Sequence, residues 1–256
     1  MTVPQPIPTG AVRYNTDSNK MEVWIGDKWM QVAVSTPNLD GGARGIVMGG
    51  NPGTNRIDFF TISTAGDATD FGDANDSVRE ATSAGSNHTR GLTAGGYSDS
   101  SNSNTDRIGA ITFSTTGNAA DFGNLNEDLY QGAACASRER AVHFGGRAGS
   151  PTNTNRNTIQ FVTIASTGNA QDFGDTTDTR YGHTSLSNQT RGLCTFGQNP
   201  VQNNIEYVTI QSTGNSIDYG DLTDGGRKNH TSCASPTRGL FFAGRDGSNN
   251  YENNIE

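Results

Sequence analysis

The feature that most constrains the fold is a repeat of about fifty residues that recurs from residue 44 to residue 256. Each copy opens with an Arg strand, in which one Arg precedes a short apolar run. An Ile strand follows it. The arginines are Arg44, Arg90, Arg140, Arg191 and Arg238, and the Ile strands begin at Ile57, Ile108, Ile159, Ile205 and Ile255. A repeat of this length indicates a unit that must stack on its neighbours to bury its apolar faces.

The remainder of each copy contains a Gly turn, an Asp-Phe-Gly strand and a small-residue strand. The Gly turns contain Gly66, Gly117, Gly168 and Gly214, and the next strands begin their motif at Asp70, Asp121, Asp172 and Asp218. Glycine supplies the positive φ that such turns require. The small-residue strand, rich in Ser, Thr and Ala, precedes the next Arg. Four short strands in about fifty residues predict one blade of a β-propeller.

We therefore expect an all-β fold, with a five-bladed propeller over residues 36–256. The unit resembles a kelch-like repeat through the Gly doublets that end the Arg strands, at 49–50, 95–96 and 145–146. It departs from that family because no Trp follows Trp29. The fifth copy lacks most of its Ile strand and all of its Asp-Phe-Gly strand. We expect N-terminal strands or another chain to complete it, because native proteins avoid open sheet edges.

The recurring Arg and Asp residues have two interpretations. The five arginines could line a channel and bind an anion. The favoured hypothesis is structural: each Arg pairs with an Asp of an adjacent Asp-Phe-Gly strand and so holds successive blades in register.

Residues 1–35 carry no repeat and predict a small β-meander. The expected strands cover residues 10–14 and 20–25 and a segment that begins at Trp29, with polar turns between them. A sheet of this size is not stable alone. We therefore expect it to dock on its own propeller, on a sister chain or on a larger particle.

The same stretch resembles an element found in structural proteins of tailed bacteriophages. The matching residues are Gly10, Arg13, Tyr14, Asn15, Thr16, Asp17, Glu22, Val23, Gly26 and Trp29. The repeats also look like those of large virion proteins of phages. The resemblance implies a virion component that assembles in the host cytoplasm, contacts other virion proteins and forms a homo-oligomer. Within the element, Arg13, Tyr14, Asn15, Asp17, Trp24 and Trp29 are the predicted anchoring residues.

Composition argues against several functions. The chain has 26 acidic and 18 basic residues, so we expect no binding to nucleic acid. It has no apolar run long enough for a membrane span and no sign of a secretion signal at its start. The four histidines and the acidic loops lack metal-site spacing, so we predict no metal, no cofactor and no catalytic residue. The three cysteines are expected to pack as small buried residues.

The candidate recognition residues lie in the loops between Arg strands and Ile strands. These loops differ from copy to copy, and they contain the bulky residues Tyr97, Arg147 and Tyr251. Variable loops on a rigid scaffold commonly carry recognition. We expect them to contact a host glycan or a neighbouring virion subunit. The predicted function is a non-enzymatic virion protein, either a tail-fibre or receptor-binding protein or a capsid decoration or head-fibre protein. A carbohydrate-active enzyme on a propeller scaffold is a third alternative.

Overall fold

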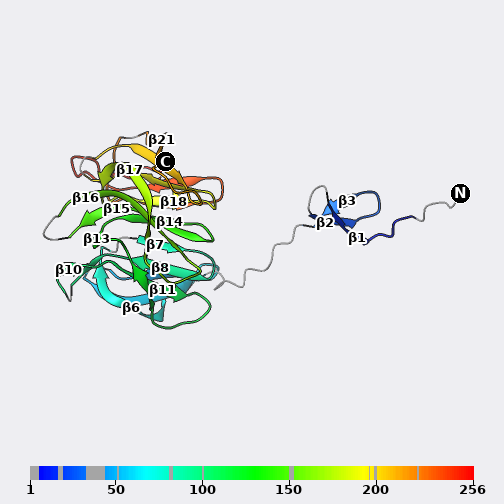
Figure 1. Ribbon diagram of the computed structural model, residues 1–256, viewed down its shortest axis with the longest axis horizontal. Coiled ribbons are helices and arrows are strands. Elements are labelled where there is room, and N and C mark those ends of the chain that lie inside the picture. Colours follow the sequence, from blue (N-terminus) through cyan, green and yellow to red (C-terminus); the bar gives the residue numbers. More distant parts are fainter. Residues whose placement is uncertain are drawn as a thin grey trace. The chain divides into compact units, whose positions relative to one another are not determined.

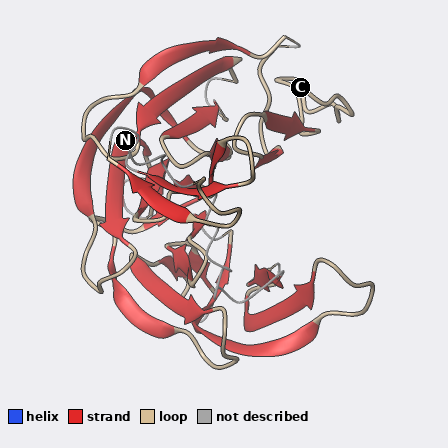
Figure 2. Cartoon of the chain, turned by 90° about the vertical axis from the view of Figure 1, so that its right-hand side faces the viewer, coloured by secondary structure: helices blue, strands red, loops and turns tan. Residues whose placement is uncertain are grey.

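The computed structural model describes residues 6–16, 20–32, 44–50, 52–80, 83–99, 101–149, 153–195, 197–198, 201–223 and 225–256. Every regular element in these residues is a β-strand, and the strands form antiparallel sheets (Figure 2). The all-β prediction is confirmed. Contacts divide the chain into two units, Met1–Asn38 and Leu39–Glu256. The boundary predicted after residue 35 falls within residues 33–43, outside the described residues.

The N-terminal unit is a three-stranded meander (Figure 1). Its strands are β1 (Val12–Asn15), β2 (Lys20–Trp24) and β3 (Trp29–Gln31). Strand β2 lies in the middle and pairs with both neighbours. The observed strands match the predicted ones to within about two residues, the usual uncertainty at element ends.

The larger unit contains one meander for each repeat, and the sheets follow one another along the chain from cyan to red in Figure 1. In the complete copies the spatial order is small-residue strand, Arg strand, Ile strand and Asp-Phe-Gly strand. The small-residue strands are β7 (Ser83–Ser86), β14 (Ala133–Ala136), β18 (Ser185–Ser187) and β22 (Thr231–Ala234). The Arg strands are β4 (Arg44–Met48), β8 (Arg90–Ala94), β15 (Arg140–Ala148), β19 (Arg191–Thr195) and β23 (Gly239–Phe242).

The outer half of each meander follows the same plan. The Ile strands are β5 (Thr54–Thr61), β11 (Arg107–Thr112), β16 (Asn155–Thr163) and β20 (Asn204–Thr209). The Asp-Phe-Gly strands are β6 (Thr69–Arg79), β12 (Ala120–Asn124), β17 (Gln171–Arg180) and β21 (Ile217–Asp221). Three short strands, β9 (Tyr97–Ser98), β10 (Ser103–Asn104) and β13 (Leu129–Tyr130), were not predicted. They connect neighbouring copies beside the loops.

Successive sheets touch first along their small-residue strands. Strand β14 lies against both β7 and β18, and β18 lies against β22. A Cβ on Gly85 would lie 2.9 Å from the Cβ of Ala141 in the next copy, so there is no space for a larger residue. The Ser187 hydroxyl donates to the carbonyl of Ala136 at 2.8 Å. The close approach of these strands explains their Ser, Ala and Gly content.

Successive sheets touch again where each Gly turn meets the Asp-Phe-Gly strand of the copy before it. The amides of Gly117, Gly168 and Gly214 donate to the carbonyls of Phe71, Phe122 and Phe173, at 2.7, 2.8 and 2.7 Å. The turn asparagine accepts a hydrogen bond in return, as when the Asp73 amide donates to Asn118 Oδ1 at 3.0 Å. The same contacts recur at three consecutive interfaces. They also cover the outer edges of the first three repeat sheets, which would otherwise expose unpaired backbone groups.

The recurring arginines also join neighbouring copies, but through a partner that differs from the predicted one. Three of them donate from Nη1 to the carbonyl at the end of the next copy's Ile strand: Arg44 to Phe113 at 2.5 Å, Arg90 to Ile164 at 3.1 Å and Arg140 to Ile210 at 3.1 Å. The motif aspartates Asp70, Asp121, Asp172 and Asp218 are instead exposed. The prediction of Arg–Asp pairing is therefore wrong. A fixed backbone carbonyl lies within reach of the guanidinium, whereas the carboxylates face solvent.

Carboxylates do join successive copies, but from other positions. Arg107 contacts Asp76 at 3.4 Å and Arg156 contacts Glu127 at 2.8 Å, and each acidic residue belongs to the preceding copy. These residues lie in the acidic segments that follow the Asp-Phe-Gly motif. At these two places the acidic segments therefore pair with an Arg of the following copy.

The first prediction concerns the glycine of the Asp-Phe-Gly strand. Gly123 has φ +152° and a Cβ there would lie 2.3 Å from the carbonyl oxygen of Gly168 in the next copy. Gly220 has φ +141° but a Cβ there would meet nothing within 4 Å. Both alanine variants therefore incur backbone strain, but only Gly123→Ala also clashes with a neighbouring sheet. We expect Gly123→Ala to lower the free energy of unfolding by about 1–3 kcal/mol more than Gly220→Ala.

Urea denaturation of the two variants beside the wild-type chain measures this difference. Equal losses of stability would mean that the Gly168 turn does not pack on Gly123 in solution.

Candidate recognition surfaces

One face of the N-terminal sheet is held together by polar and aromatic contacts. Glu22 lies at its centre, with Arg13 Nη2 at 2.7 Å and Asn15 Nδ2 at 3.0 Å from its carboxylate. These hydrogen bonds, first the one from Asn15 and then the one from Arg13, hold the pKa of Glu22 below its ordinary value. The Arg13 guanidinium lies 4.2 Å from the centre of the Trp29 ring, which packs edge-on against Trp24.

The opposite face of this sheet is apolar and exposed. Strand pairing places Val12, Val23 and Met30 side by side, with Tyr14 beside Met21. The exposed members are Val12 at 58%, Tyr14 at 57%, Met21 at 46%, Ile25 at 49%, Met30 at 43% and Val32 at 38%. An apolar face of this kind usually marks an interaction site, because soluble proteins seldom leave such patches uncovered.

The predicted anchoring residues therefore have two different positions. Arg13, Asn15, Trp24 and Trp29 form the face that stabilises the sheet itself, whereas Tyr14 belongs to the exposed apolar face. Asp17 lies outside the described residues. Sequence reasoning predicted the three-stranded meander but did not separate its two faces, although the alternation of Met21, Val23 and Ile25 with polar or aromatic neighbours already indicated them.

The three predicted recognition residues all take part in cation–π pairs at the loops. The Arg79 guanidinium lies over Tyr97 at 4.7 Å, Arg147 over Tyr181 at 5.4 Å and Arg245 over Tyr251 at 4.5 Å. Tyr97 also donates to Asn102 Oδ1 at 2.6 Å. Tyr97 and Arg147 are half-buried, whereas Tyr251 is 80% exposed. Of the three, Tyr251 is the residue most available to a partner.

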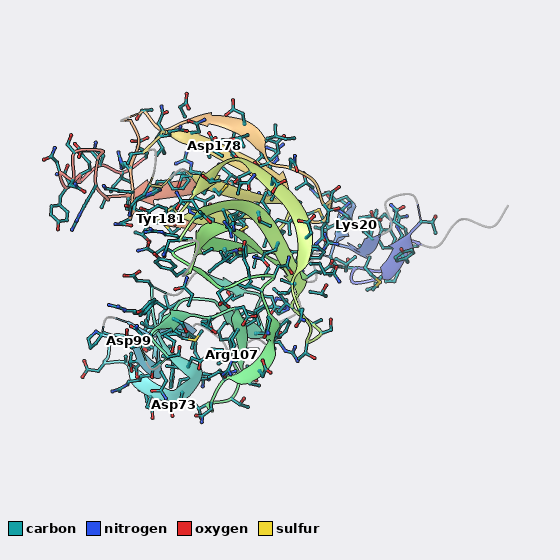
Figure 3. The ribbon with its side chains drawn as sticks, turned by 60° about the vertical axis from the view of Figure 1, so that its left-hand side comes forward. Lys20, Asp73, Asp99, Arg107, Asp178 and Tyr181 are labelled. Carbon is teal, nitrogen blue, oxygen red and sulfur yellow. The ribbon has the colours of Figure 1, made fainter. Side chains whose placement is uncertain are left out.

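The loops of neighbouring copies form a connected surface, the loop face. The Arg-to-Ile loop of one copy pairs with the end of the Asp-Phe-Gly strand of the copy before it, as Val78 pairs with Ser98, or with the residue just after that strand, as Tyr181 pairs with Gln198. Asp99 additionally accepts the Gly53 amide at 2.8 Å. Asp99 and Tyr181, from different copies, lie toward the same side of this unit in Figure 3. These ties give the variable loops a rigid support.

The interior holds several polar side chains that sequence reasoning did not single out. Arg180 and Glu206 form an ion pair at 2.7 Å with both side chains essentially inaccessible. Arg180 also donates to the Thr195 carbonyl at 3.1 Å. His143, His183 and His230 are buried as well, and burial lowers the pKa of each. These groups lie buried among packed strands.

The cysteine prediction is correct at two positions and wrong at the third. Cys135 and Cys194 are buried, and burial raises the pKa of both thiols to about 12. Cys233 is exposed in β22, which belongs to the last and least covered sheet.

The comparisons with known proteins assign no family. No protein-family model matches the sequence, and no curated protein matches it significantly. Within the described ranges, no group of three or more His, Cys, Asp or Glu side chains is placed to hold a metal ion. The same residues contain no helix with the length and apolar character needed to cross a bilayer.

Proposed function

We propose that this chain is a non-enzymatic structural protein of a tailed-phage virion, in which the N-terminal sheet attaches to the particle and the repeats are displayed. The observation that carries the proposal is the exposed apolar face of the N-terminal sheet. A three-stranded sheet gains stability by packing that face against a partner. The partner is another virion protein, and several copies of the chain assemble on one particle.

The displayed part is a kelch-like β-propeller with five copies of the repeat as blades. Two features support this architecture. The small-residue strands of successive sheets lie against one another, as the innermost strands of blades do around an axis. The Gly turns pack on the preceding Asp-Phe-Gly strands at the other edge of each sheet.

The display role that the loop face favours is attachment to a host surface, as in a tail fibre or receptor-binding protein. Tyr251 presents an exposed aromatic ring with a hydroxyl group, a combination suited to the mixed apolar and polar surface of a glycan. Capsid decoration or a head fibre is the second candidate. Tyr97 and Arg147 favour this candidate, because both side chains pack against other residues of the chain and so leave less of the loop face free to bind a ligand.

The attachment proposal predicts opposite results for two neighbouring residues of β3. Met30 is exposed on the apolar face, whereas Gln31 belongs to the other face and accepts a hydrogen bond from Lys20 at 3.2 Å. We expect Met30→Glu to reduce the amount of chain on purified particles at least about tenfold, because a carboxylate would be buried without a partner. Gln31→Glu should leave it unchanged. The amount of each variant that sediments with the particles is the measurement.

Equal incorporation of both variants would show that the apolar face does not attach the chain to the particle, and the proposed attachment role would be wrong. Imaging of labelled chain on the particle then separates tail from capsid. Binding of the full chain to host cells, with and without Tyr251→Ala, tests attachment to the host independently.

A further inference from the structure

The outer face of the fourth copy is built like a repeat-to-repeat interface but is uncovered. At the three complete interfaces the aromatic residues Phe71, Phe122 and Phe173 are only 3%, 3% and 2% exposed. Their counterpart Tyr219, in β21, is 55% exposed. Tyr219 still packs edge-on against Tyr207, as Phe71 packs against Phe59 and Phe173 against Phe161. The fourth sheet therefore has the interface geometry without the neighbouring Gly turn.

The backbone at Gly220 and the side chain of Arg191, both in this fourth sheet, also lack, within the described part of the chain, the neighbour that their counterparts contact. A Cβ on Gly72, Gly123 or Gly174 would lie 2.3–2.5 Å from the backbone of the next Gly turn, but one on Gly220 would meet nothing within 4 Å. Arg191 lies over the Tyr207 ring at 4.9 Å, as Arg44 lies over Phe59 and Arg140 over Phe161. Among the described residues, no carbonyl of a following Ile strand accepts from Arg191, as Phe113 and Ile210 do from its counterparts.

The inner part of the fifth copy is already in place beside this face. Strands β22 and β23 pair with each other, and Ile255 forms a bridge with Phe242. Glu256 accepts from Arg227 Nη2 at 2.5 Å and from the Thr223 amide at 2.7 Å. The corresponding Glu206 of the fourth copy pairs with Arg180 and Thr177 in the same way. Residues 255–256 thus occupy the first positions of an Ile strand.

We propose that this face binds an added β-hairpin with the repeat's own pattern: an Ile strand that continues along β23, a Gly turn that packs on β21, and an Asp-Phe-Gly strand. Continuity with the three complete interfaces specifies its contacts. The turn amides donate to the carbonyls of Tyr219 and Asp221, the turn asparagine accepts the Asp221 amide, and the Ile-strand end accepts from Arg191. Main-chain hydrogen bonds of this kind are the usual basis of strand addition.

The remaining space fits a hairpin better than a whole repeat. A second copy of the chain could offer its first Gly turn, since Ile62 is 69% exposed where Ile164 and Ile210 are fully buried. However, that turn brings Arg strand β4 paired with β5, and the matching position beside the fourth copy is already occupied by β23. The uncovered face therefore fits the outer half of a sheet.

The test supplies such a hairpin from the chain's own sequence. Residues 205–222 are added to the full chain as a synthetic peptide, and, in a second protein, residues 207–222 are fused after Glu256. Because Ile205-Glu206 matches Ile255-Glu256, the fusion continues the strand in register. We expect hydrogen exchange at the Asp221 amide to slow at least about tenfold in the fused protein, with weaker slowing at high peptide concentration.

Gly220→Ala is the matched control, because its methyl group meets nothing in the chain itself but would meet the backbone of the added turn. In this variant the fused hairpin should give no slowing at Asp221. The proposal is overturned if the fused hairpin leaves exchange at Asp221 unchanged in the wild-type background. It is also overturned if Gly220→Ala makes no difference, or if the full chain alone forms dimers that protect Asp221 and that Ile62→Asp disrupts.

Discussion

Between about pH 6 and pH 4 the protein is expected to lose about 4 kcal/mol of stability for each pH unit, because three buried histidines stay neutral in the fold. Burial lowers the pKa of His143 to about 3 and that of His230 to about 4. The pKa of His183 lies well below its ordinary value, through burial and then through the charge of Arg180. In the unfolded chain each ring has its ordinary pKa of about 6.5, so at a pH below that value the ring gains a proton on unfolding.

The direction follows from proton binding. A folded-state pKa below the unfolded value means that the unfolded chain binds more protons in between. The stability is therefore fully present above about pH 6.5 and falls as pH decreases towards the folded-state values. At His143 the fall continues to about pH 3, and both of its ring nitrogens are buried without a hydrogen-bond partner among the described residues.

Two histidine variants separate this cause from general acid effects. His143→Leu should reduce the slope of stability against pH by about 1.4 kcal/mol per unit, because one proton is no longer taken up. His88 is exposed, so His88→Leu should leave the slope unchanged. Urea midpoints between pH 7 and pH 5 give both slopes. A His143→Leu slope equal to that of wild type would show that the ring is accessible to protons in the folded chain.

The second large effect is expected at the buried ion pair of the fourth copy. Glu206→Ala should lower the free energy of unfolding by about 3–5 kcal/mol, because it leaves the Arg180 guanidinium buried without its counter-charge. Glu206 also accepts hydrogen bonds from the hydroxyls of Ser216 and Thr177, and both would lose their partner. The Thr195 carbonyl, which accepts from Arg180 at 3.1 Å, is uncharged and does not replace the carboxylate.

The matched control is the partly exposed pair Arg156–Glu127, with side chains 28% and 31% exposed. Glu127→Ala should cost about 0–1 kcal/mol, the range of pairs that water can replace. Chemical denaturation at neutral pH compares the two variants. Similar costs would show that water reaches Arg180 in the folded chain.

The carboxylate of Glu206 also has a pH dependence of its own. Burial opposes ionisation, but Arg180 and the hydrogen bonds from Ser216 and Thr177 outweigh it, so the pKa of Glu206 lies below its ordinary value. Its contribution is therefore present at neutral pH. It is lost only as pH falls through the lowered pKa, below the pH at which the histidine effect begins.

The sequence predicts the strands of this protein well because the repeat gives several independent examples of one pattern. Ile57, Ile108 and Ile159 are almost completely buried, as the first residue of an alternating strand with one covered face should be. Gly117, Gly168 and Gly214 have φ values of +152°, +157° and +153°, which agrees with the expected turn, whereas Gly66 lacks the expected positive φ. Local pattern and backbone geometry point to the same elements.

Contacts between copies were harder to predict because they depend on distances that a sequence does not contain. The arginines donate to carbonyls, and every residue has a carbonyl, so nothing in the sequence identifies the acceptor. One feature of the sequence could have indicated the Arg180–Glu206 and Arg227–Glu256 pairs. In the last two copies a Glu directly follows the Ile, whereas the earlier copies have Asp58, Gly109 and Gln160 at this position. In both pairs the Arg belongs to the preceding copy.

The most direct test of the stacked-repeat account is amide hydrogen exchange at the four Gly turns. Gly117, Gly168 and Gly214 donate to the preceding sheet, whereas Gly66 has no such acceptor among the described residues. We predict that the first three amides exchange at least about a hundredfold more slowly than that of Gly66. If all four amides exchange at the same fast rate, successive sheets do not pack through their Gly turns, and the stacked-repeat account is wrong.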